Sequence, residues 1–202
     1  MANQVVFYIS AASDLEVERE ILGRAVTEVP VDLGWRVVQS PAGNGPVDLE
    51  AITHAGVHVV LMGSDIRAPI GLEWQVARQA GRRPVAFLKQ ETLRTPAGQD
   101  FVRAIRHTQS WVPFADGAEL RRKVLELLAE HLLNHAVHYV LKPEEMATLS
   151  SWRDGLAKES EAVDEETRGG AGESSVILSR ERFMPSGGVI IGEATAEREP
   201  RS

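Results

Sequence analysis

Through its first 140 residues the chain alternates short, almost wholly apolar runs with amphipathic stretches, and this alternation constrains the fold most. The apolar runs are continuous, which is typical of strands that are covered on both faces of a sheet. Strands that alternate with helices form a parallel sheet with right-handed crossovers, so we predict an α/β fold with a flavodoxin-like, doubly wound sheet. The five expected strands are residues 5–10, 35–40, 57–63, 84–89 and 110–114. The five expected helices are residues 15–28, 49–54, 72–80, 99–106 and 118–141.

A change in charge near Lys142–Pro143 separates this region from an acidic C-terminal part. Lys and Arg nearly balance Asp and Glu up to residue 142 (15 against 16), whereas the remainder holds 7 against 13. After one more expected helix the chain becomes acidic, glycine-rich and poor in apolar residues, which predicts a linker. Two short strand-like runs then predict a hairpin that is too small to be stable alone. The expected parts are an α/β domain (1–142), a helical extension (143–158), a linker (159–174) and a hairpin-like tail (175–202).

Composition excludes several classes of protein. The chain has no cysteine, which excludes disulfides, thiolate metal sites and cysteine nucleophiles and favours a cytoplasmic protein. Its net charge is −7 and it has no stripe of Lys and Arg, so we expect no dedicated nucleic-acid binding. We also expect neither a membrane span nor a signal peptide, because no apolar run is long enough and no basic region precedes one.

The first expected strand ends abruptly in small and polar residues, Ser10–Ala11–Ala12–Ser13–Asp14, directly before a helical pattern. This order places backbone N–H groups at the carboxyl edge of the sheet, where α/β proteins bind nucleotides and phosphates. Ser10, Ser13 and Asp14 are therefore candidate ligands for ribose or phosphate oxygens. The structural alternative is that these residues end the strand and that Ser13 or Asp14 caps the helix.

The same segment, VFYISAASDLEVERE, resembles the start of a TIR-like family catalogued as domain of unknown function 4062. A second stretch, VHVVLMGSDIRAPIGLEWQVARQAGRRPVAFLK, resembles that family's next strand, variable loop, helix and strand. The same layout recurs in TIR domains and in nucleoside deoxyribosyltransferases. The resemblance covers about residues 4–135 and supports the doubly wound fold. The chain departs from the family pattern at Ala11, where a second serine is usual, and at SDIRAPIG, which replaces an "RYG"-like stretch.

The resemblance implies that Glu73 corresponds to a carboxylate that serves cleavage of an N-glycosidic bond. Such cleavage builds positive charge on the ribose, which a nearby carboxylate stabilises or attacks. Apart from the resemblance, Arg67 in the loop before Glu73 is a candidate to steer a phosphate or pair with Glu73, and Trp74 is a candidate to stack on a base or nicotinamide ring. The structural alternatives are a solvated loop arginine and a tryptophan packed in the core or at an interface. No cofactor is required, and NAD or a related nucleotide is the implied substrate or ligand. The structural alternative for Glu73 is a favourable place in the first turn of its helix.

The last expected helix changes its apolar face along its length, which a helix that buries a single stripe does not do. We expect its first half to pack on the sheet and its second half to pack on the C-terminal segment or on another subunit. The two sets of apolar residues are Leu120, Val124, Leu127 and Leu128, then Leu132, Leu133, Ala136 and Val140.

His131, His135 and His138 lie on one face of this helix at spacings that can build a metal site. No carboxylate lies among them, and they continue the apolar stripe, so we expect packing at an interface and no metal.

Two functions remain open. The first is a TIR-like interaction or assembly module, with a nucleotide as a candidate ligand, in a bacterial-type signalling or defence system. It would associate with a second copy or a protein partner through the last helix and the C-terminal tail. The second is an enzyme that cleaves NAD or a related nucleoside or nucleotide with Glu73, either a glycohydrolase or similar to a deoxyribosyltransferase. We favour the module because the departures from the family pattern fall in the ligand loops.

Overall fold

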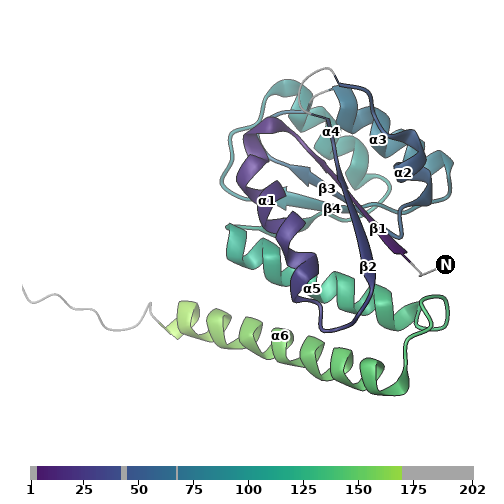
Figure 1. Ribbon diagram of the computed structural model, residues 1–202. Coiled ribbons are helices and arrows are strands. Elements are labelled where there is room, and N and C mark those ends of the chain that lie inside the picture. The colour runs from purple at the N-terminus through teal and green to yellow at the C-terminus, as the bar shows by residue number, and fades with distance from the viewer. Residues whose placement is uncertain (1–3, 42–44, 67, 170–202) are drawn as a thin grey trace, which may run out of the picture. The chain divides into compact units, whose positions relative to one another are not determined.

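The computed structural model describes residues 4–41, 45–66 and 68–169 (Figure 1). Five parallel strands form one sheet in the order β2-β1-β3-β4-β5, which confirms the expected flavodoxin-like α/β fold. The strands are β1 (Gln4–Ala11), β2 (Gly34–Gln39), β3 (Val57–Met62), β4 (Val85–Lys89) and β5 (Val112–Phe114). The α-helices are α1 (Glu16–Ala25), α2 (Leu49–His54), α3 (Ala68–Gln79), α4 (Pro96–Arg106), α5 (Gly117–Asn134) and α6 (Pro143–Gly169).

Helices cover both faces of the sheet, as continuous apolar strands require. On one face, Phe7 and Ile9 of β1 join Leu22 of α1 and Leu120 of α5 in the main core. On the other face, Tyr8 of β1 packs with residues of α2 and α3. Figure 1 shows α1 and α5 on one side of the strands and α2, α3 and α4 on the other. Successive residues of β1 therefore point into two different cores, because side chains alternate along a strand.

Helix α5 is shorter than expected. It ends at Asn134, because His135 adopts non-helical backbone angles (φ −117°, ψ 25°). The following residues, up to Val140, form turns and include the β-branched and aromatic side chains of Val137 and Tyr139, which have lower helix propensity than alanine or leucine. The prediction of a helix to residue 141 was wrong for this reason.

Helix α6 packs against α5 and α1. Leu149 of α6 is fully buried in the main core, and Leu156 packs with Leu125 of α5 and Ala25 of α1. Of the second apolar set, Leu132 is fully buried whereas Val140 is 75% exposed, so this set is buried within the chain only in part. The compact unit reaches Val163, so the charge change near residue 142 does not mark the end of the domain.

The expected linker is a second correction, since α6 continues past residue 158 to Gly169. The segment that follows Lys158 is rich in Glu and contains no proline, and Glu, Lys and Ala are strong helix formers even where apolar residues are few. Low apolar content therefore did not exclude a helix there. Residues 170–174 and the expected hairpin-like tail (175–202) lie outside the described residues.

Candidate functional site

The loops after β1 and β3 are joined at the carboxyl edge of the sheet by Asp14. Its Oδ2 accepts hydrogen bonds from the Ser64 backbone N–H (2.8 Å) and from Ser64 Oγ (2.6 Å). A Cβ at Gly63 would lie 2.5 Å from this oxygen, so the contact requires glycine there. A 3₁₀ turn, Ser13–Leu15, precedes α1. No side chain caps the start of this turn or of α1, so neither Ser13 nor Asp14 is a helix cap. Both side chains are exposed, and Asp14 serves to hold two loops together.

Glu73 is fully buried (0% exposed) and faces the sheet. Tyr8 Oη donates a hydrogen bond to Glu73 Oε1 (2.9 Å), and Ser40 Oγ donates to Oε2 (2.6 Å). Tyr8 comes from β1 and Ser40 directly follows β2, so one carboxylate fastens α3 to two neighbouring strands. Burial, and then the Glu73 carboxylate, raise the pKa of Tyr8, which therefore remains a hydrogen-bond donor at neutral pH.

The position of Glu73 in its helix differs from the expectation. Helix α3 begins at Ala68, before the expected residue 72, so its first turn contains no acidic residue. Pro69 lies in the first turn of α3, which the fixed φ of proline suits. The helix dipole therefore does not account for Glu73, whereas its two hydrogen bonds do.

A second buried pair lies beside Glu73 on the same face of the sheet. Ser10 Oγ and His58 Nε2 share a hydrogen bond of 2.8 Å, and the two residues are 0% and 4% exposed. The His58 ring packs edge-on against Tyr8 at a centroid distance of 5.0 Å. Burial lowers the pKa of His58 to about 3, so its imidazole is neutral at physiological pH. We call Tyr8, Ser10, Ser40, His58 and Glu73 the buried polar network.

Sequence reasoning did not single out three members of this network, Tyr8, Ser40 and His58. A histidine inside the otherwise apolar strand VHVVLM was the available signal, because a buried polar side chain needs a partner. The spacing of Tyr8 and Ser10 also places them on one face of β1.

The other predicted ligand residues do not join this network. Ser13 and Asp14 are exposed, as described above, and Arg67 lies outside the described residues. Trp74 is partly buried and packs against a small apolar cluster that includes Val60 and Ile70. The structure thus links Glu73 with Ser10 through Tyr8 and His58, and it places Trp74 in the packing of α3.

The three histidines do not share one helix face as expected, because only His131 lies in α5 while His135 and His138 lie in the turns after it; the three line a pocket at the opposite, amino edge of the sheet. His131 and His135 stack at a ring distance of 4.3 Å, and His131 Nε2 shares a hydrogen bond of 2.8 Å with Tyr139 Oη. No three His, Asp or Glu side chains within the described ranges are arranged to hold a metal ion.

Comparisons with protein-family models and with curated proteins found no match. Among the described residues, no helix has the length and apolarity needed to cross a membrane.

Proposed function

We propose that this chain is a TIR-like interaction module of a bacterial-type signalling or defence system, in which Glu73 has a structural role. The observation that carries the proposal is the burial of Glu73 with a hydrogen bond to each carboxylate oxygen. A carboxylate that stabilises or attacks a ribose must lie beside that sugar. Glu73 would have to give up its bonds to Tyr8 and Ser40 to do so, and both donors would then lose a buried acceptor.

The exposed edge of β2 is the surface through which we expect the module to associate. β2 pairs with β1 alone and ends the sheet. Ser40 N–H donates to Ile9 O (2.9 Å), so the alternate residues Val37 and Gln39 direct their backbone groups away from β1. Such a row of unpaired groups is a template for another strand.

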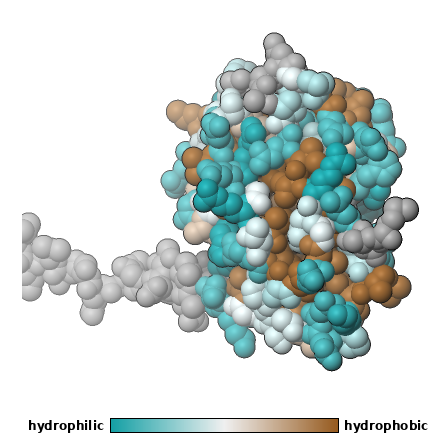
Figure 2. All heavy atoms as spheres, viewed as in Figure 1, coloured by the Kyte–Doolittle hydropathy of each residue, from teal (hydrophilic) through white to brown (hydrophobic). Residues whose placement is uncertain are grey.

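Figure 2 shows a strip of apolar surface down the middle of the face on which β2 lies in Figure 1. Trp35 and Val37, which pack against the main core, and Val38, which packs on the other face of the sheet, are only partly buried. A second copy of the chain offers the same backbone row and the same strip, and two-fold pairing of identical edges makes a closed dimer. We therefore propose that the partner is a second copy.

The oligomeric state tests this interface. We expect the wild-type chain to associate with increasing concentration in analytical ultracentrifugation, and we expect Val37→Lys to shift it to the monomer, since lysine on an edge opposes pairing. Leu93→Lys is the matched control, because Leu93 is 96% exposed after β4, away from β2. A monomeric wild-type chain at every concentration, or equal association of both variants, would overturn the proposed interface.

A base-release assay tests the structural role of Glu73. The assembled chain is incubated with NAD and with deoxynucleosides, and free base is measured. We expect none. Base release that Glu73→Gln abolishes, with thermal unfolding unchanged, would refute the module and establish an enzyme that cleaves N-glycosidic bonds.

A further inference from the structure

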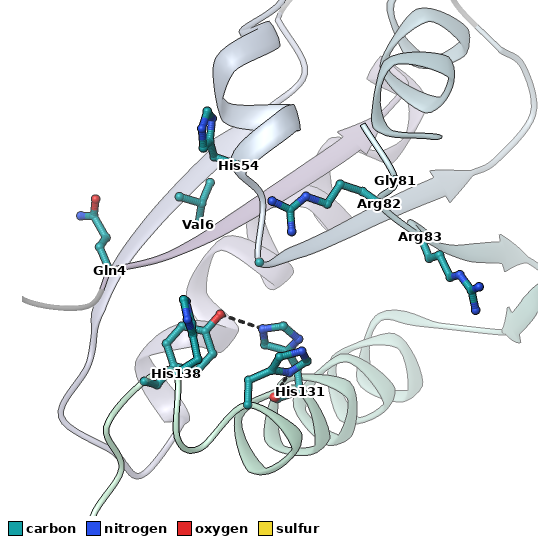
Figure 3. A pocket seen from close by; sticks show the side chains of 11 residues that line it. Gln4, Val6, His54, Gly81, Arg82, Arg83, His131 and His138 are labelled. Atoms are coloured by element: carbon teal, nitrogen blue, oxygen red, sulfur yellow. Dashed lines mark hydrogen bonds between the residues drawn. The ribbon is translucent and has the colours of Figure 1, made fainter. Parts of the chain in front are cut away.

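A pocket of about 560 Å³ opens at the amino edge of the sheet, where the strands begin (Figure 3). Gln4 of β1 and Gly56, just before β3, contribute to it, as do Arg82 and Arg83 before β4. The histidines that end α5 form another wall. This pocket lies at the end of the sheet opposite to Ser40, which follows the carboxyl end of β2, so it is separate from the buried polar network. We call it the amino-edge pocket.

The lining of this pocket is rich in basic side chains. It includes two arginines and four histidines, and none of the described residues that line it is acidic. Within the described ranges, neither Arg82 nor Arg83 forms an ion pair. In Figure 3, Arg82 reaches over the pocket below His54, while His131 and His138 lie on the opposite side. Unpaired positive charge at a hollow attracts an anion.

The backbone conformation at the end of α3 positions Arg82 and Arg83 at the pocket. Gly81 has a positive φ of 73° and ends α3, with its N–H bonded to Arg78 O (3.1 Å). Arg82 N–H bonds to Ala77 O (2.9 Å), which completes the helix-ending Schellman motif. Arg82 Nε also donates to Thr53 O (2.9 Å), which holds the guanidinium beside the pocket. The arginine is thus positioned in advance, and this reduces the entropy cost of binding.

A second hollow of about 520 Å³ shares Gly81, Arg82 and Arg83 with the first and adds Arg78 to the lining. Arg78 also has no ion-pair partner within the described residues. Three arginines without acidic partners therefore border two adjoining hollows. This extent of charge suits a chain of phosphates better than a single small anion, because each phosphate can take its own charged donors.

His131, in the wall opposite the arginines, is neutral near pH 7. Burial, and then His135 and His138, lower the pKa of His131 to about 4. The other titratable groups that line the pocket are His54, Tyr139 and the two arginines. Arg82 and Arg83 therefore supply the permanent positive charge of the pocket.

We propose that the amino-edge pocket binds a small polyphosphate, either free or carried by a nucleoside, between Arg82 and Arg83 on one side and the histidines at the end of α5 on the other. The guanidinium groups would bind phosphate oxygens through paired N–H donors, and the imidazoles would add donors when protonated. This site is independent of the proposed module function and of Glu73.

Isothermal titration calorimetry on the whole chain tests the proposal, with sodium triphosphate, ATP and adenosine as separate probes at low salt. We expect triphosphate and ATP to bind and adenosine not to bind. Tighter binding of ATP than of triphosphate would identify a nucleoside-borne ligand, and equal binding would identify the polyphosphate itself as sufficient.

Arginine variants make the test specific. Arg82→Gln and Arg83→Gln should each weaken triphosphate binding about tenfold or more, as the loss of a charge-assisted contact does. Arg103→Gln in α4 is the matched control, because Arg103 is exposed and lies outside the lining of either hollow. Arg83 makes no side-chain hydrogen bond within the described residues, so its variant keeps the test valid if Arg82→Gln fails to fold. Failure of triphosphate to bind the wild-type chain, or equal weakening in all three variants, would overturn the proposal.

Discussion

Lowering the pH from about 7.5 to about 5 should destabilise the folded chain, because the sheet holds His58 in its neutral form. The pKa of His58 is about 3 in the folded chain, against 6.5 for an ordinary histidine in the unfolded chain. The unfolded chain therefore takes up a proton as the pH falls below 6.5, whereas the folded chain does not until the pH approaches 3. The stability that neutral His58 contributes is fully present above pH 6.5 and is lost as the pH falls through this window.

The size of the effect follows from the same two pKa values. Between them, one proton bound only by the unfolded state changes the free energy of unfolding by about 1.4 kcal/mol per pH unit. At pH 5 this amounts to a loss of about 2 kcal/mol, a large fraction of the stability of a domain of this kind. His131, whose pKa is also lowered, acts in the same direction but less, because its side chain is only partly buried.

Urea unfolding followed by circular dichroism at several pH values measures this loss. The variant His58→Gln should be less stable at pH 7.5, because the hydrogen bond with Ser10 is disturbed, and it should lose about 2 kcal/mol less than the wild type on acidification. His107→Gln, at an exposed position, is the control and should keep the wild-type dependence. If acidification destabilises His58→Gln as much as the wild type, His58 is not the source and the reasoning is wrong.

Three further predictions concern stability, and urea unfolding at pH 7.5 checks each. Glu73→Ala should lower the free energy of unfolding by about 3 kcal/mol, because Tyr8 Oη and Ser40 Oγ then lose their acceptor. A decrease of less than about 1 kcal/mol would contradict a stabilising role for the buried polar network. Gly81→Ala should lower the free energy of unfolding by about 1 kcal/mol because of its positive φ, since nothing lies within 4 Å of the added Cβ. Gly155→Ala, inside α6 and with equal space, should raise the free energy of unfolding. A change of the same sign in both variants would contradict this account. Leu149→Ala should cost about 3 kcal/mol because Leu149 is 0% exposed, and a change near zero would show that α6 is not part of the core.

Local sequence patterns predicted most of the strands and helices. Continuous apolar runs predicted all five strands to within about two residues at either end, and α2 was predicted with its observed bounds. These features depend on neighbours in the chain, which the sequence displays directly. The errors lay at the ends of helices: α3 begins earlier than expected, α5 ends earlier, and a charged stretch extends α6.

The site depended on tertiary structure. The sequence alone determined the doubly wound sheet and drew attention to Glu73. Only the packed chain decided its partners, because Tyr8 and Ser40 lie 65 and 33 residues away and meet it through the order of β2 and β1. The amino-edge pocket arises in the same way, since Arg82 and His131 come from segments on either side of the sheet. Periodicity determines which face of an element is buried, but the pairing of strands and helices decides which side chains meet there.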